Sequence, residues 1–163
     1  MSEKHYISEA GFQKLSDEVA HLMTVERPRI VRNVADAAAE GDRSENAEYI
    51  YGKKRLREID RRVEYLTKRL DSFEVVPRPT RTDRVRLLVW VIVEDDEGDS
   101  RAFRVVGADE TNADHGEISW KSPVGRALLG KAVDDEVVVR TPGGQLTYTI
   151  VDICLDAPML EDA

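Results

Sequence analysis

Two carboxylates three positions apart, Asp42 and Glu45, are the residues of this chain best suited to chemistry. They lie in the turn 40–46, with the sequence EGDRSEN, between two long segments with helical patterns. At the start of a helix, this spacing lets both carboxylates project from the same end. Mg²⁺ prefers oxygen ligands and often takes only one or two from a protein, while water and phosphate supply the rest. The pair is therefore predicted to complete a metal site whose other ligands belong to a partner.

Helix capping is the competing interpretation of the same two carboxylates. The spacing Asp42-x-x-Glu45 is a variant of the capping box that begins helices. Acidic side chains at a helix N-terminus also interact favourably with the helix dipole. A position at the far end of a long rod favours the metal interpretation, and both interpretations stay open from these residues alone.

The segment before the turn has the hydrophobic spacing of a helix. Ser8 is a candidate N-cap. The following apolar residues have the three-four spacing of a coiled-coil seam, and they are Phe12, Leu15, Val19 and Leu22. Pro28 is expected to kink the helix or restart it. The spacing then resumes in a new phase at Ile30, Val34 and Ala37.

The segment after the turn has a more regular helical pattern. Its seam positions are Tyr49, Gly52, Leu56, Ile59, Val63, Leu66, Leu70 and Phe73. Gly41 is expected to end the first helix. Helices joined by so few residues must be antiparallel neighbours. Each arm has ~30 residues, and a rise of ~1.5 Å per residue predicts a rod ~45 Å long with the acidic turn at its end.

The second half of the chain changes to a strand-like period of two. Strands are expected at Val85–Glu94, Arg101–Val106, Glu117–Trp120, Glu136–Arg140 and Leu146–Ile153. A short helix is expected at Val124–Leu129, with Ser122 as N-cap and Pro123 at its first position. The predicted organisation is a coiled-coil hairpin with an acidic tip at 1–76, a linker at 77–81, and a mostly antiparallel α+β domain at 82–163.

Positive charge gathers along the second helix, although the whole chain has a formal net charge of −8. The basic strip consists of Lys53, Lys54, Arg55, Arg57, Arg61, Arg62, Lys68 and Arg69. One interpretation is a solvated helix face with ion pairs between successive turns. The excess of positive charge favours contact with a nucleic-acid backbone. Tyr49 and Tyr51 are close enough to the turn to stack on a base, although Tyr49 also fits the seam.

Sequence signals of a self-contained enzyme are mostly lacking. The three histidines are far apart, and the chain has neither a glycine-rich phosphate loop nor a nucleophile elbow. The single cysteine, Cys154, excludes a disulfide within the chain, and its apolar surroundings favour a partly buried structural thiol. No segment approaches the ~18 apolar residues of a membrane span, and no signal-peptide pattern is present. A soluble cytoplasmic protein without a membrane partner is expected.

The sequence GDRSENAEY at 41–49, with its flanking helices, resembles the tip signature of the bacterial Gre transcript cleavage factors. Further similar segments follow in order over almost the whole chain, including 26–30, 53–62, 104–107 and 126–131. The basic segment 53–62 looks like the GreB branch of that family. Two segments depart from the family pattern. Val85–Val91 lacks the usual small Phe-Gly-Ala-like segment, and Asp134–Glu136 has aspartate where glycine is usual.

The resemblance implies a factor without activity of its own that enters the secondary channel of RNA polymerase. Its globular domain, FKBP-like in this family, would dock at the channel rim while the hairpin reaches the active centre. Asp42 and Glu45 would help to hold the second catalytic Mg²⁺ there, so that the polymerase hydrolyses backtracked RNA near its 3′ end. The Mg²⁺ would be held jointly with the polymerase, and the isolated protein is expected to be a monomer without metal.

The resemblance also implies roles for the neighbouring residues. The tip-supporting residues would be Gly41, Arg43, Ser44, Asn46 and Tyr49. The residues that bind the nascent RNA 3′ end would be Lys53, Lys54, Arg55, Arg57, Arg61 and Arg62. Three other functions remain as alternatives: a Gre-like channel binder that inhibits the polymerase, a peptidyl-prolyl isomerase, and a plain coiled-coil adaptor. The intact Asp42 and Glu45 pair argues against the inhibitor, and fold alone is weak support for the isomerase.

Overall fold

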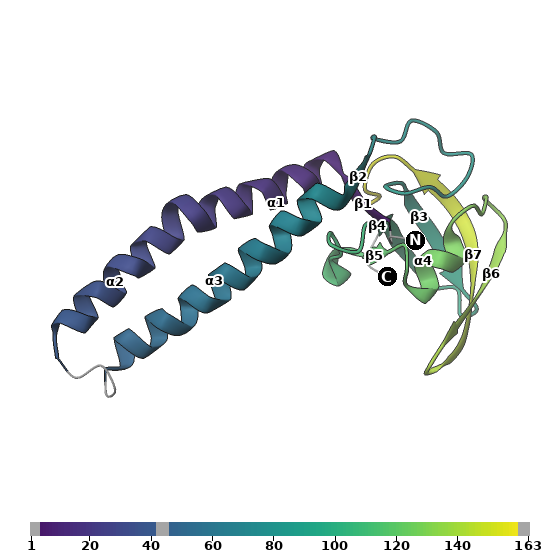
Figure 1. The fold of residues 1–163 in the computed structure, drawn as a ribbon. Coiled ribbons are helices and arrows are strands. Elements are labelled where there is room, and N and C mark those ends of the chain that lie inside the picture. Colours follow the sequence, from purple (N-terminus) through teal and green to yellow (C-terminus); the bar gives the residue numbers. More distant parts are fainter. Residues whose placement is uncertain (1–3, 42–45, 160–163) are drawn as a thin grey trace. The chain divides into compact units, whose positions relative to one another are not determined.

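The computed structural model describes residues 4–41 and 46–159 of the 163-residue chain. Two compact units are present. One is the helical hairpin Ala10–Phe73, and the other combines the chain from Glu74 onward with the N-terminal segment up to Glu9. The predicted fold class, an antiparallel helical hairpin followed by a small α+β domain, is confirmed (Figure 1). The N-terminal segment lies in the globular unit, whereas the sequence had suggested a hairpin over 1–76.

The first arm of the hairpin is nearly continuous. Helix α1 (Glu9–His21) leads into a π-helical turn (Leu22–Glu26) and then into α2 (Arg27–Ala39). Pro28 lies in the first turn of α2, where its missing N–H is tolerated. The predicted restart of the helix therefore takes the form of a π-helical turn just upstream, where Arg27 N–H donates to the Leu22 carbonyl.

The second arm is the single helix α3 (Ala47–Ser72), which packs along the first arm (Figure 1). Buried Leu22, Ile30 and Ile59 form the seam, with Val34, Leu56 and Val63 packed against them. Gly52 is also buried in this seam, and a Cβ added there would clash with Cγ2 of Val34. Glycine at this position lets the two helices approach closely near the tip.

Gly52→Ala is expected to lower the free energy of unfolding of the hairpin by about 1–3 kcal/mol, because overpacking exceeds the gain in helix propensity. Val34 is β-branched and stiff at χ1, so its methyl group cannot swing away easily. Urea unfolding measures the change. The double variant Gly52→Ala/Val34→Ala should recover stability relative to Gly52→Ala. A gain of about 1 kcal/mol in Gly52→Ala alone, as at an open helix position, would contradict the close contact.

A two-stranded sheet, absent from the sequence-based prediction, pairs β1 (His5–Ser8) with β2 (Phe73–Val76). Phe73 therefore ends the helix, and its ring still packs edge-to-face against Phe12 of the first arm, with ring centroids 6.5 Å apart. Ser8 directly precedes α1, as predicted for an N-cap, but its N–H and hydroxyl donate to the Glu110 carboxylate. Pairing between segments so far apart in sequence leaves little local signal, which explains the omission.

The globular unit is built on a curled five-stranded sheet with the order β5-β4-β3-β7-β6 (Figure 1). The strands are β3 (Trp90–Asp95), β4 (Ser100–Val106), β5 (Glu117–Ser119), β6 (Glu136–Thr141) and β7 (Gly144–Cys154). Neighbours are antiparallel except β4 and β5, which are parallel. A 3₁₀ turn (Ala113–His115) precedes β5. Helix α4 (Pro123–Leu128) inserts Leu128 into the core, and the Ser122 hydroxyl accepts from Gly125 N–H at 3.1 Å, which confirms the predicted N-cap.

Both segments that departed from the family pattern contain a residue in the left-handed region. Leu88 and Asp134 each have φ of +75°, a conformation that favours glycine. The strand predicted from Val85 consequently begins only at Trp90, because residues 86–89 form a turn in which Val89 N–H donates to the Arg86 carbonyl at 3.4 Å. Val85 and Val89 are nevertheless buried in the core, so burial rather than strand pairing explains the apolar run.

Cys154 is half-buried at the end of β7, in agreement with a structural thiol. Burial raises the pKa of the thiol, and the nearby Asp152 carboxylate raises it further. Among residues 4–41 and 46–159, no helix is long and apolar enough to cross a lipid bilayer.

Candidate functional site

The predicted metal pair occupies the turn between α2 and α3. Asp42, Arg43, Ser44 and Glu45 lie outside the described residues, so their roles stay predictions. The described residues on either side define the helix ends that carry them. α2 ends at Ala39, Gly41 has φ of +131°, and α3 begins at Ala47.

Asn46 caps the ends of both helices. Its Oδ1 accepts from Tyr49 N–H at 3.1 Å, which makes it the N-cap of α3. Its Nδ2 donates to the Ala37 carbonyl at 2.8 Å, at the end of α2, and this carbonyl also accepts from Glu40 N–H at 3.2 Å. One half-buried side chain thus links the two helices just inside the turn.

The position of this cap bears on the capping-box interpretation of the acidic pair. The N-cap of α3 is Asn46, so Asp42 does not occupy the position that a capping box requires. The capping-box interpretation of the Asp42 and Glu45 spacing is therefore wrong.

Asn46→Ala is expected to destabilise the tip end of the hairpin by about 1–2 kcal/mol, since an N-cap and an interhelical hydrogen bond are both lost. Amide hydrogen exchange of Tyr49 and Ile50 measures the effect locally. Asn46→Asp separates the two functions, because a carboxylate accepts from Tyr49 N–H but cannot donate to Ala37. Equal protection in wild type and both variants would show that the double cap does not form in solution.

The predicted RNA-binding cations fall into two groups. Arg55 Nε donates to Glu26 Oε1 at 2.7 Å, and Arg62 Nε donates to Glu18 Oε2 at 2.6 Å. Both pairs join the two arms of the hairpin, as does Arg27 with Asp60 at 2.9 Å. The hydrogen bond from Arg62 lowers the pKa of Glu18. Arg55 and Arg62 therefore have structural partners that the sequence did not reveal.

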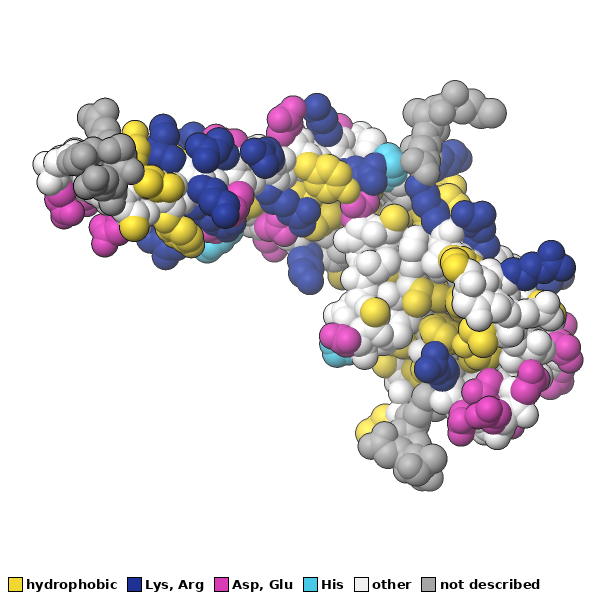
Figure 2. All heavy atoms as spheres, turned by 90° about the horizontal axis from the view of Figure 1, so that it is seen from below, with side chains coloured by type: hydrophobic (Ala, Val, Ile, Leu, Met, Phe, Trp, Pro, Cys, Tyr) yellow, Lys and Arg dark blue, Asp and Glu magenta, His cyan; other side chains and the backbone are white. Residues whose placement is uncertain are grey.

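The other cations of this set are exposed and have no such partner. They are Lys53, Lys54, Arg57 and Arg61. None of these four residues forms an ion pair with another residue in the described part of the chain. Lysine and arginine side chains line much of the hairpin face in Figure 2. These four residues, named here the free cations, are the part of the basic strip available to a polyanion. Whether they or the paired arginines contact RNA stays a prediction.

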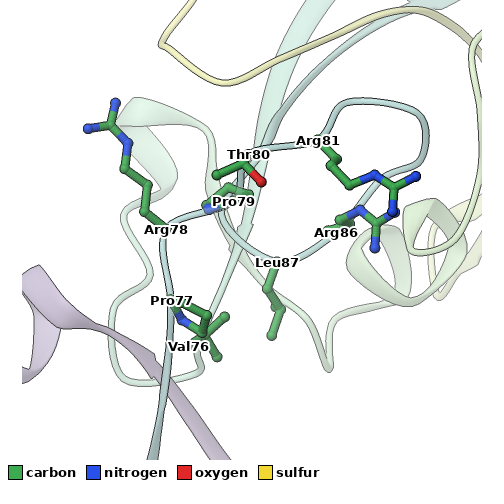
Figure 3. A pocket seen from close by; sticks show the side chains of 8 residues that line it. All are labelled: Val76, Pro77, Arg78, Pro79, Thr80, Arg81, Arg86 and Leu87. Carbon is green, nitrogen blue, oxygen red and sulfur yellow. The ribbon is translucent and has the colours of Figure 1, made fainter.

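An arginine-rich hollow of about 410 Å³ lies on the globular unit. Its lining consists of Val76, Pro77, Arg78, Pro79, Thr80, Arg81, Arg86 and Leu87 (Figure 3). Asp83 accepts from Arg86 at 2.9 Å and lies 3.7 Å from Arg81, and the hydrogen bond from Arg86 lowers its pKa. Figure 3 shows Arg81 and Arg86 side by side, with Arg78 turned away from them. The sequence interpretation treated 77–81 only as a linker, although the four arginines in 77–86 were a visible signal.

No group of three or more metal-ligating side chains occurs within residues 4–41 and 46–159. The described part of the hairpin does supply exposed aromatic residues near the turn. Tyr51 is 66% exposed and Ile50 52% exposed, whereas Tyr49 is half-buried, as its seam position predicts.

Comparison with known proteins places this architecture in a family. A family model described as the N-terminal domain of transcription elongation factors matches residues 5–75, and one for the GreA/GreB C-terminal domain matches 79–154. The chain is 52% identical over 154 residues to transcription elongation factor GreB of Yersinia pestis, covering 94% of this chain and 90% of that protein. It is 46% identical over 161 residues to GreB of Haemophilus ducreyi, covering 98% and 99%.

A solved structure of the transcription factor Gfh1 aligns with 94% of this chain and 99% of its own, with a TM-score of 0.46 and 22% identity. The family models together cover both units of the chain, and the GreB proteins match it over nearly its whole length. The chain belongs to the GreA/GreB family of transcription elongation factors, in its GreB branch.

Proposed function

We propose that this protein inserts its hairpin into the secondary channel of RNA polymerase and stimulates the polymerase to hydrolyse backtracked RNA near its 3′ end. Arrested elongation complexes would thereby be rescued. One observation carries the proposal within this family. Asn46 is the N-cap of α3, so a capping box that begins at Asp42 does not account for the acidic pair that precedes it.

Asp42 and Glu45 would contribute oxygen ligands to a Mg²⁺ site completed by the polymerase. Two carboxylates alone hold Mg²⁺ weakly, so the isolated protein is expected to bind none. When it is bound jointly, Mg²⁺ supplies a more acidic water and stabilises charge that develops on the phosphate. The carboxylates would orient the water that they contact, and the double cap of Asn46 would keep both helix ends together behind them.

The free cations would attract the phosphates of the extruded RNA. Without them, the carboxylates at the tip would repel that polyanion, because the whole protein is acidic. The globular unit would dock at the channel rim, and one monomer would suffice for each polymerase. The site of action would be the cytoplasm, where bacterial transcription takes place.

Stalled, backtracked elongation complexes test this function directly. With Mg²⁺ and the protein, the transcript is expected to shorten from its 3′ end faster than with polymerase alone. Slower nucleotide addition without any added cleavage would instead identify an inhibitor of the channel. If the protein binds but changes neither RNA cleavage nor nucleotide addition, a plain coiled-coil adaptor would be the remaining interpretation.

A further inference from the structure

A hollow of about 450 Å³ lies between α2 and α3, a short distance from the turn. Its lining is Ile30, Asn33 and Asp36 from α2 and Glu48, Tyr51 and Gly52 from α3. All six residues belong to the hairpin unit. Gly52 contributes only backbone to the wall, and Tyr51 presents a largely exposed ring beside it. This volume lies within the range of sites for small organic groups.

The polar side chains of this hollow are exposed and have no protein partner within the described structure. Those of Asn33, Asp36, Glu48 and Tyr51 form no hydrogen bond or ion pair with any residue in 4–41 or 46–159. An amide, two carboxylates and a phenol are thus left to face solvent or a ligand. An aromatic face next to such groups is the combination with which proteins bind unpaired nucleobases, by stacking and by hydrogen bonds to the base edge.

We propose that this hollow, here called the base pocket, receives one nucleobase of the extruded RNA, stacked on Tyr51, and that it prefers guanine. Guanine presents its N1–H and its amino group side by side, so one carboxylate, Asp36 or Glu48, accepts from both. Uracil has a single N–H flanked by two carbonyl oxygens, which carboxylates repel. The proposal rests on the proposed function, which brings single-stranded RNA to the hairpin.

The charges around the pocket distinguish a base from other ligands. Two carboxylates in the wall disfavour phosphate inside, which argues against a nucleoside polyphosphate or another small anion. Cations flank the pocket instead. Lys54 follows Tyr51 by three residues and Arg29 precedes Asn33 by four, so each lies on the same helix face as a pocket residue. Neither forms an ion pair with a described residue, so both can hold phosphates while the base enters.

A series of backtracked complexes tests the base preference. Their extruded RNA contains uridine only, or a single guanosine or inosine at each position in turn. Stimulated cleavage should be fastest with guanosine at one position. Inosine lacks the amino group, so the rate advantage with inosine at that position should be about tenfold smaller. Tyr51→Ala and the double variant Asp36→Asn/Glu48→Gln should each abolish the stimulation that depends on base and position. The control Ile50→Ala removes an exposed neighbour outside the pocket and should keep it.

Any preference of the polymerase itself for particular bases is the same with every variant, so it cancels when the variants are compared with wild type. Equal dependence on the base in wild type, Tyr51→Ala and Asp36→Asn/Glu48→Gln would overturn the base pocket. Tyr51→Phe keeps the ring without the hydroxyl and should retain most of the effect, since stacking is the larger contribution.

Photocrosslinking separates failure of the pocket from failure of the proposed function. A 6-thioguanosine at each extruded position should crosslink to residues of the pocket at one position, in wild type and in Asp42→Asn, but not in Tyr51→Ala. Crosslinking without stimulated cleavage would support the pocket and overturn the cleavage function. Stimulated cleavage without a Tyr51-dependent crosslink would overturn the pocket alone.

Discussion

Asp42→Asn is expected to slow stimulated cleavage of backtracked RNA by on the order of a hundredfold, while binding to the polymerase is unchanged. The amide has nearly the shape of the carboxylate but lacks its charge, so the shared Mg²⁺ is held more weakly. Glu45→Gln should have a similar effect for the same reason. The rate of release of the 3′ fragment under single-turnover conditions measures cleavage, and competition with labelled wild type measures binding.

Two features of this result identify a shared metal site. Raising the Mg²⁺ concentration should partly restore each single variant, because a weaker ligand set needs more metal. The double variant should be little slower than either single variant, because the two carboxylates act as a unit.

Glu40→Gln is the matched control for the acidic pair. This variant removes an exposed carboxylate at the first residue of the turn, the C-cap of α2, and should stimulate cleavage normally. An equal loss in this variant would mean that acidity at the hairpin end matters in general. Normal cleavage in Asp42→Asn and Glu45→Gln would exclude the proposed metal site.

Replacement of the free cations Lys53, Lys54, Arg57 and Arg61 by glutamine is expected to weaken cleavage most for complexes with long extruded RNA. Each cation that neutralises a phosphate of a single strand contributes ~0.7 to the salt dependence of binding. Loss of all four should lower the slope of log rate against log salt by up to about 3. Cleavage rates at several salt concentrations, for short and long extruded RNA, measure the change.

The paired arginines Arg55 and Arg62 are the matched comparison for the free cations, because they have the same type of charge but already have partners in the hairpin. Arg55→Gln/Arg62→Gln removes two ion pairs between the arms, with Glu26 and Glu18. The expected result is a loss of about 0.2–1 kcal/mol of unfolding free energy per pair, with little change in the salt slope. A reduced slope with unchanged stability would instead assign these arginines to RNA.

Local patterns in the sequence predicted much of the fold correctly. The three-four spacing identified both arms of the hairpin, and Ser122 with Pro123 marked the start of α4. The apolar run from Val85 was misread as a strand from its first residue, since burial and strand pairing favour the same β-branched residues. The left-handed backbone at Leu88 interrupts it, and leucine gives no sign of that conformation.

For the candidate site, too, some features follow from the sequence and others only from the structure. The sequence by itself determined the acidic turn between two antiparallel helices and the surplus of cations beside it, because both are encoded by neighbouring residues. The interpretation of Asp42 and Glu45 as a capping box was wrong. Asp42 and Asn46 are both suitable N-cap residues, and only the observed helix boundary shows that Asn46 is used.

Only the tertiary structure decided which cations are free and where the hollow between α2 and α3 forms. The partners of Arg55 and Arg62 are 29 and 44 positions away in sequence, and the pocket combines residues from two helices. Such contacts depend on the register in which the arms pack. Gly52 and Val34 help to set that register through a close approach that has no signal in either segment alone.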